Sequence, residues 1–159
     1  MSVDFFIAGV QKGGTTALDH YLRAHPQIQT AAVKEVHHFD NDTVDWRKPD
    51  HSWLESFFDW SVPAVVRGEA TPIYTYWPDS LKRMHRYNAD AKLIVGLRHP
   101  SFRAFSHWRM ETTRGAETLA FEHAIGWQAR SRVRLEPRGA HRVFRMWNAG
   151  STRVRSVSC

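Results

Sequence analysis

Apolar residues dominate the first stretch of the chain, from Val3 to Val10, and then give way to glycines and threonines. An apolar run of this length that ends in glycine indicates a buried strand followed by a tight turn. From Thr15 the apolar residues follow a helical period, and His25-Pro26 ends the predicted helix. The residues on its apolar face are Ala17, Leu18, Tyr21 and Leu22. A strand, a glycine-rich loop and a helix in this order form half of a βαβ unit.

The middle of the chain continues the alternation of strands and helices. Short apolar stretches predict strands over 28–33 and 64–68, and the polar stretch 40–60 predicts a loop followed by a short helix. A helix is expected over about 78–88, and its inner face is expected to carry Leu81, Met84 and His85.

A second strong strand is predicted over 91–98, where the apolar run is again continuous, as in a parallel strand covered on both faces. Pro100 opens a helix that extends to about Met110. The apolar residues of this helix are Phe102, Phe105 and Trp108. A last helix is predicted over 118–130.

This order of elements predicts an α/β fold with a central, mainly parallel sheet flanked by helices. Ligands of such sheets bind beyond the carboxyl ends of the strands. The loops 11–16, 69–72 and 98–106 follow predicted strands, and they are therefore the places to look for a site.

The composition fits a folded domain. The chain has 159 residues, of which 42% are hydrophobic, so one domain with a real core is expected. No apolar run is long enough to span a membrane and no signal peptide is recognised, which predicts a cytoplasmic protein. The single cysteine, Cys159, excludes a disulfide within the chain and a cysteine-based zinc site.

The net charge of +6 suggests a nucleic-acid partner, but its distribution argues against one. Residues 126–159 contain eight arginines and one acid, Glu136, whereas residues 1–125 contain 14 basic and 15 acidic residues. The excess charge therefore belongs to the last fifth of the chain, and no nucleic-acid partner is expected.

The loop after the first strand has the composition of an anion site. Gly13 and Gly14 permit close backbone approach, and the next helix begins with amides that can point at an anion. Lys12 adds a charge, and Thr15 and Thr16 add hydroxyl donors. The same residues would also suit a tight strand-to-helix turn with a solvated lysine.

This loop is not a Walker A motif, because Lys12 precedes the glycines instead of following them. The other strong strand ends in Leu97-Arg98 and not in an aspartate that could hold Mg²⁺. An anion loop without a metal carboxylate suggests a phosphorylated donor that is handled without metal.

Two separated motifs resemble those of sulfotransferases that use 3′-phosphoadenylyl sulfate (PAPS). The stretch 11–18, Gln-Lys-Gly-Gly-Thr-Thr-Ala-Leu, is similar to the family's loop for the 5′-phosphosulfate. The stretch 98–106 is similar to its 3′-phosphate motif, with an arginine at a strand end and a serine eight residues later. The stretch 34–39, Lys-Glu-Val-His-His-Phe, resembles the heparan-sulfate-type and related bacterial enzymes, and the resemblance covers residues 3–147.

The resemblance implies a P-loop-like three-layer fold and transfer of a sulfuryl group from PAPS to a hydroxyl or amine of a small-molecule or carbohydrate acceptor. It makes Lys12 the group that stabilises the departing phosphate, and Glu35 the base, with His37 as a second candidate. The loop residues Gly13, Gly14, Thr15 and Thr16 would bind the co-substrate together with Arg98 and Ser106, and no metal is implied. Heparan-type relatives often have lysine where Ala70 stands, so the acceptor stays open.

Family members are usually longer, and the pattern changes after about Trp147. We therefore expect a sulfotransferase domain over 1–147, incomplete at its C-terminus, with a divergent tail over 148–159, as in a truncated or frame-shifted gene product. Three alternatives remain: a catalytically impaired remnant that binds the nucleotide, a nucleotide kinase, and a basic nucleic-acid-binding protein.

Overall fold

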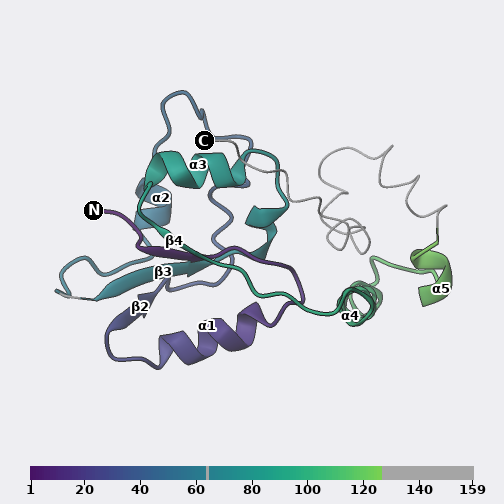
Figure 1. The fold of residues 1–159 in the computed structure, drawn as a ribbon. Helices are drawn as coiled ribbons and strands as arrows, with labels where there is room; N and C mark the ends of the chain where they lie inside the picture. Colours follow the sequence, from purple (N-terminus) through teal and green to yellow (C-terminus); the bar gives the residue numbers. More distant parts are fainter. Residues whose placement is uncertain (64, 127–159) are drawn as a thin grey trace. The chain divides into compact units, whose positions relative to one another are not determined.

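The computed structural model describes residues 1–63 and 65–126, drawn in colour in Figure 1. The elements within these residues, in chain order, are β1 (Phe5–Ile7), α1 (Thr15–Arg23), β2 (Ile28–Thr30), α2 (Ser52–Glu55), β3 (Val66–Ala70), the 3₁₀ helix η1 (Pro72–Thr75), α3 (Ser80–Tyr87), β4 (Lys92–Ile94), α4 (Pro100–Thr113) and α5 (Phe121–Ala124). The chain divides into two compact units, the first ending at Leu97 and the second beginning at Arg98.

The four strands form one parallel sheet in the order β2-β3-β1-β4. Phe5 in β1 is opposite Gly68 on one side and Lys92 on the other, so β1 lies inside the sheet. Because every strand runs in the same direction, the segments that follow β1, β2 and β3 leave the sheet at one edge.

Helices cover both faces of this sheet in the first unit (Figure 1). α1 lies on one face, and α2, α3 and η1 lie on the other. The predicted α/β fold, with a mainly parallel sheet between helical layers, is confirmed.

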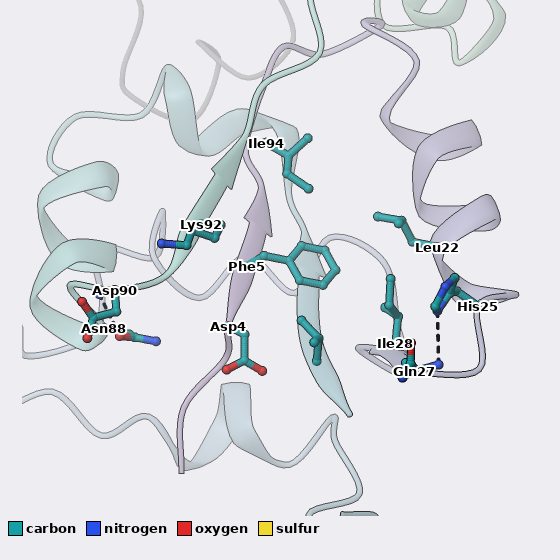
Figure 2. A pocket seen from close by; sticks show the side chains of 11 residues that line it. Asp4, Phe5, Leu22, His25, Gln27, Ile28, Asn88, Asp90, Lys92 and Ile94 are labelled. Carbon is teal, nitrogen blue, oxygen red and sulfur yellow. Dashed lines mark hydrogen bonds between the residues drawn. The ribbon is translucent and has the colours of Figure 1, made fainter. Parts of the chain in front are cut away.

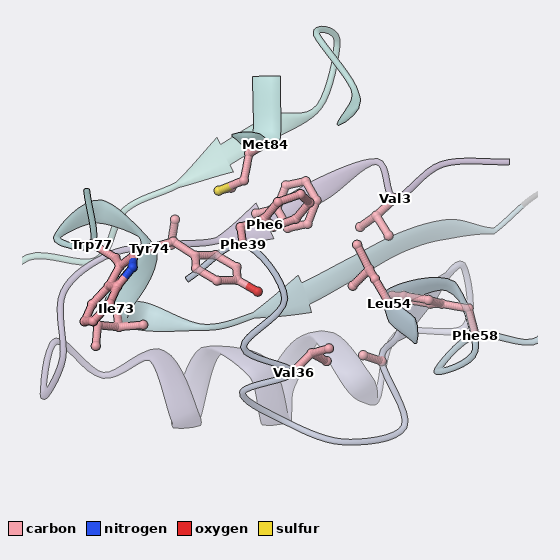
Figure 3. Close-up of a cluster of buried hydrophobic side chains, with 12 residues drawn as sticks. Val3, Phe6, Val36, Phe39, Leu54, Phe58, Ile73, Tyr74, Trp77 and Met84 are labelled. Carbon is pink, nitrogen blue, oxygen red and sulfur yellow. The ribbon is translucent and has the colours of Figure 1, made fainter. Parts of the chain in front are cut away.

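Side chains of β1 alternate between the two faces, as strand geometry requires. Phe5 and Ile7 pack with Leu18 and Leu22 of α1. Phe6 belongs to the larger cluster on the other face, which Figure 3 shows. That cluster also contains Val3, Ala8, Ala31, Val36, Phe39, Leu54, Phe58, Ile73, Tyr74, Trp77 and Met84. Since both faces of β1 are buried, this strand anchors the sheet.

The predicted strand 64–68 is displaced, because β3 spans Val66–Ala70. Gly68 does not end the strand but lies in its interior, where a Cβ atom would come within 1.9 Å of the Phe5 ring. The glycine therefore marks a close approach between neighbouring strands and not a turn.

The prediction for the inner face of α3 is wrong for two of its three residues. Met84 is buried, but Leu81 and His85 are exposed. Ser80 takes the second inward position, one helical turn before Met84, and its hydroxyl donates to Phe39 O at 3.0 Å. A buried hydrogen bond thus sets the rotation of this helix.

The predicted strand 91–98 is observed as the shorter β4, and it is not covered on both faces. Leu93 is 46% exposed, and β4 pairs only with β1, at the edge of the described sheet. Ile94 faces α1 and is partly buried.

In the second unit, the buried residues of α4 are polar. Arg103, His107 and Glu111 are buried at successive turns, whereas Phe102 and Phe105 are 64% and 45% exposed. The helix predicted over 118–130 is observed as the short α5, and its residues after 126 lie outside the described part of the chain. In the part that the structure describes, no helix is long and apolar enough to cross a membrane.

A cavity of about 630 Å³ opens at the amino ends of the strands (Figure 2). Its floor is apolar, with Phe5, Leu22 and Ile28, and Asp4 and Lys92 add charges. These residues begin strands or end α1, so the cavity lies at the edge opposite the segments that follow β1, β2 and β3.

Candidate functional site

The loop that connects β1 to α1 begins by extending the sheet. The Ala8 amide donates to Ile94 O and the Val10 amide to Gly96 O, each at 3.0 Å. The chain then turns, and the Gly13 amide donates back to Val10 O at 2.9 Å. The start of the loop is therefore fixed on the sheet by two backbone bonds, and one further bond closes its turn.

Two residues of this turn have left-handed backbone: Lys12 with φ of 64° and Gly14 with φ of 91°. Gly13 lies between them against the chain after β4, where a Cβ atom would come within 2.6 Å of Gly96 O and 2.8 Å of Val10 O. Only glycine fits this approach without a backbone shift. When successive residues alternate between right-handed and left-handed backbone conformations, their amides point toward one side. Anion-binding concavities form in this way.

The loop ends at the first turn of α1, whose amides have no acceptors within the helix. The Leu18 amide is the first to bond within the turn, to Gly14 O at 3.1 Å. The first turn of α1 contains no acidic residue, so its positive end is not neutralised within the helix. Thr15 is buried and Thr16 is exposed. This arrangement suits a phosphate or another anion.

The segment after β2 carries a cluster of charged side chains around Glu35. Lys34 Nζ donates to Glu35 Oε1 at 2.5 Å, and His37 Nε2 lies 3.7 Å from Glu35 Oε2. The hydrogen bond from His37, with that from Lys34, lowers the pKa of Glu35 to about 2. Glu35 is therefore ionised near neutral pH.

His37 lies between two carboxylates. Its Nδ1 is 2.9 Å from Oδ2 of Asp40, whose side chain is fully buried, and its Nε2 faces Glu35. The Asp40 carboxylate can only accept a hydrogen bond when ionised, so it favours a proton on Nδ1. A histidine held in this way can exchange a proton at Nε2.

His38, next along the chain, points into the core instead. It is 2% exposed, and its Nε2 lies 2.9 Å from His51 Nδ1 beside the rings of Phe39 and Trp46. Burial lowers the pKa of His38 to about 4. His38 therefore packs in the core and does not face the Glu35 cluster.

Glu69 is a buried group of the stretch 69–72, which the sequence pattern marked as a place to look for a site without giving Glu69 a role. It is 1% exposed at the end of β3, and burial raises its pKa to about 7. Its Oε1 accepts from the amide of Val36 at 3.2 Å and from the hydroxyl of Thr71. The sequence showed only an acidic residue shortly before Pro72, which does not reveal that its side chain is buried.

The first unit brings the Lys12 loop and the Glu35 cluster to the same edge of the sheet. Ile7 at the end of β1 is opposite Ala70 at the end of β3, and Ala70 O accepts from the Glu35 amide at 2.9 Å. The anion loop therefore leaves the end of β1, and the turn that carries the ionised carboxylate is bonded to the end of β3, the neighbouring strand.

The second unit brings Arg98 and Ser106 together. Arg98 Nη1 donates to Ser106 Oγ at 3.0 Å, from two residues before α4 to the second turn of that helix. Guanidinium and hydroxyl donors at this spacing can bind one phosphate. Arg103, on α4 between these two residues in the sequence, is 2% exposed on the buried face of the helix, and burial lowers its pKa.

Among residues 1–63 and 65–126, no group of three or more histidine, cysteine or acidic side chains is arranged to hold a metal ion. The stretch His141-Arg142-Val143-Phe144 and the expected domain boundary near 147 lie outside the described residues.

The chain matches one family by its sequence model, described as "Sulfotransferase domain", over residues 2–148. It is 33% identical over 125 residues to the human protein heparan sulfate glucosamine 3-O-sulfotransferase 6, covering 76% of this chain and 35% of that protein. It is 31% identical over 131 residues to a membrane-associated sulfotransferase of Dictyostelium discoideum, covering 77% of this chain and 27% of that protein. The chain thus spans about a third of the length of these curated relatives.

Among solved structures, the fold is similar to that of a sulfotransferase from Alicyclobacillus acidocaldarius, with a TM-score of 0.77 and 29% identity. The match covers 94% of this chain and 64% of that one.

Proposed function

Because this chain belongs to the sulfotransferase domain family, we propose that it transfers a sulfuryl group from PAPS to a hydroxyl or amine of an acceptor. The observation that carries the proposal is the loop between β1 and α1. The backbone of its turn alternates between left-handed and right-handed conformations, and its Gly13 lies against Gly96. The loop ends at a helix whose first turn contains no acidic residue.

Lys12 and the amides at the start of α1 bind the 5′-phosphosulfate in this proposal. Transfer breaks the bond between sulfur and the bridging oxygen, and negative charge develops on the departing phosphate. A cation fixed beside that oxygen stabilises the charge as it forms. Lys12 is the cation of this loop, and Gly13, Gly14, Thr15 and Thr16 supply backbone and hydroxyl donors.

Glu35 accepts the proton that the acceptor loses when the acceptor's oxygen or nitrogen forms its bond to sulfur. Its pKa of about 2 keeps the carboxylate ionised at neutral pH, although a strong acid is also a weak base. His37 compensates for the weak basicity of Glu35, because the Nε2 atom of His37 faces Glu35 while Asp40 holds its Nδ1 atom. The pair can share the proton until it is released to water.

Arg98 and Ser106 bind the 3′-phosphate that distinguishes PAPS from other adenine nucleotides. Their direct hydrogen bond at 3.0 Å presents a guanidinium and a hydroxyl together. A planar guanidinium binds a phosphate through two parallel hydrogen bonds.

A carbohydrate is the acceptor class that the relatives favour, since those named for a substrate act on heparan sulfate glucosamine. Ala70 stands at the strand end beside Glu35 and provides no charge toward an acidic polysaccharide. We therefore propose a carbohydrate hydroxyl or amine without assigning the sugar.

Calorimetry of the full chain with adenosine 3′,5′-bisphosphate tests the donor site, with ATP–Mg²⁺ as the comparison. Selective binding of the bisphosphate is expected, and equal or preferential binding of ATP–Mg²⁺ would favour a nucleotide kinase. Radiolabelled PAPS with heparan sulfate oligosaccharides, and separately with simple alcohols, phenols and amines, tests transfer. Binding without transfer to any of these would identify a nucleotide-binding remnant.

A further inference from the structure

The turn that carries Glu35 and His37 has an unusual backbone. Both residues have left-handed φ values, 65° and 57°, and Val36 between them is buried. Residues other than glycine adopt this conformation only where surrounding contacts hold them, and such positions concentrate at functional sites.

The contacts that hold this turn all come from the end of β3 and from η1. Four consecutive amides, those of residues 35 to 38, each donate a hydrogen bond there. The acceptors, in order, are Ala70 O at 2.9 Å, Glu69 Oε1 at 3.2 Å, Thr71 Oγ1 at 3.5 Å and the Tyr74 hydroxyl at 3.1 Å. Three of the four acceptors are side chains, so particular residues of this segment, and not only its backbone, hold the turn.

Glu69 and Thr71 form one connected unit within this set. The Thr71 hydroxyl donates to Glu69 Oε1 and accepts from the His37 amide. A hydroxyl has a single proton, so its donation to Glu69 leaves its lone pairs for the amide. The same carboxylate oxygen accepts from Val36, between the two left-handed residues.

This unit places a carboxylate where burial is unfavourable. Glu69 is 1% exposed, and its second oxygen, Oε2, has no hydrogen-bond partner among the described residues. Burying a carboxylate with one oxygen unsatisfied costs free energy that an apolar residue would not. A carboxylate is nevertheless suited to accept two donors at one oxygen, which the turn requires.

We propose that Glu69 and Thr71 are positioning residues that fix the turn 35–37, so that the Glu35 carboxylate faces His37 and the acceptor. The inference rests on the proposed function for the role of Glu35, whereas the positioning itself rests on the contacts. Neither residue touches the reacting atoms: both act through the backbone of the turn.

The test compares Thr71→Val, which removes the hydroxyl at constant volume, with Thr71→Ser, which keeps it. Thr30→Val is the matched control, because Thr30 is a buried threonine of the neighbouring strand whose hydroxyl has no partner among the described residues. Carbon-detected NMR titration of Glu35 is the readout, since its pKa of about 2 depends on the contact with His37.

In Thr71→Val the pKa of Glu35 is expected to rise toward its ordinary value, while Thr71→Ser and Thr30→Val keep it low. The turnover of PAPS is expected to fall about tenfold in Thr71→Val, with the KM for PAPS unchanged. A Glu35 pKa that stays near 2 in a folded Thr71→Val protein would overturn the proposal.

Hydrogen exchange of the unmodified chain covers the case in which Thr71→Val does not fold. The amides of residues 35–38 are expected to exchange as slowly as those of β3, and exchange at the rate of an exposed loop would overturn the proposal. Glu35→Gln distinguishes the proposed role of Glu35 in transfer from the positioning of the turn. Full sulfuryl transfer by that variant would refute the role of Glu35, yet leave the exchange and titration results as evidence for positioning.

Discussion

His37 Nδ1 lies 2.9 Å from Oδ2 of Asp40, and the Asp40 side chain is fully buried. A buried carboxylate against one ring nitrogen decides which nitrogen carries the proton. The opposite nitrogen, Nε2, faces Glu35 at 3.7 Å. Asp40 thereby orients the histidine toward the carboxylate that is proposed to act as base.

Asp40→Asn is expected to lower turnover of PAPS by at least about tenfold, because the amide does not impose the same proton position on His37. Nitrogen NMR of the His37 ring would report the change in tautomer directly. The affinity for adenosine 3′,5′-bisphosphate should stay unchanged, and so should the turnover of Asp90→Asn, an exposed aspartate of the same unit. Wild-type turnover in Asp40→Asn would contradict the role given to this pair.

Lys12→Ala is expected to lower turnover by about 10²–10³-fold, the usual loss for one preorganised group that stabilises developing charge. The thermal midpoint should change little, since Lys12 is on the loop surface and only partly buried. Lys82→Ala, an exposed lysine of α3, is the control for loss of charge alone. Unchanged turnover in Lys12→Ala would remove Lys12 from the reaction.

The two loop glycines are expected to respond differently to alanine. Gly13→Ala places a Cβ atom 2.6 Å from Gly96 O, so the loop must move, at a cost of about 1–3 kcal/mol. Gly14→Ala meets nothing within 4 Å, and its cost is limited to about 1–2 kcal/mol for the left-handed backbone. Urea unfolding and calorimetry with the bisphosphate check both, and Gly13→Ala should bind more weakly than Gly14→Ala. The reverse order would mean that contact with Gly96 does not shape the anion site.

Arg98→Ala is expected to weaken binding of adenosine 3′,5′-bisphosphate by roughly ten- to a hundredfold, as for loss of a charged hydrogen bond. Binding of adenosine 5′-phosphate should not change, because that nucleotide lacks the 3′-phosphate. Arg109→Ala, an exposed arginine of α4, is the charge-matched control. Equal weakening of both nucleotides would place Arg98 elsewhere than at the 3′-phosphate.

Much of the fold was predictable because its signals are local. The apolar run before Gly13 and the helical period after Thr15 depend on neighbouring residues, and both elements are observed. Gly68 misled the prediction for β3, because the reason for that glycine is the Phe5 ring on another strand. A close approach between distant segments leaves no trace in the local pattern.

In the candidate site, too, the features that depend on local sequence were predictable and those that depend on distant contacts were not. Motif positions identified Glu35 and His37, but not the backbone that presents them. Their left-handed φ values depend on acceptors more than 30 residues away in the sequence, among them Glu69. A buried carboxylate is recognisable only when the fold has enclosed it.

Two buried groups contribute in opposite directions to the expected pH dependence of stability between pH 4 and 7. Burial lowers the pKa of His38 to about 4, so the unfolded chain binds the extra proton and stability rises with pH through this range. Glu69 acts in the other direction, because its pKa is raised to about 7 and the folded chain retains the proton. A variant of Glu69 alone is therefore needed to isolate the contribution of its carboxylate to the pH dependence.

As the pH rises, the free energy of unfolding of Glu69→Gln is expected to increase progressively relative to that of the unmodified chain. Below about pH 4.5 the Glu69 carboxyl is neutral in both states, so the two proteins should differ only by a constant. Between pH 4.5 and 7 the unmodified chain loses stability that the amide retains, up to about 3 kcal/mol if the whole shift is realised. Urea unfolding at pH 4.5, 6 and 7.5 measures this difference, and His38 cancels because it is common to both proteins. A difference that is constant with pH would mean that Glu69 is ionised at its ordinary pKa, and that the fold does not hold it in an unfavourable environment.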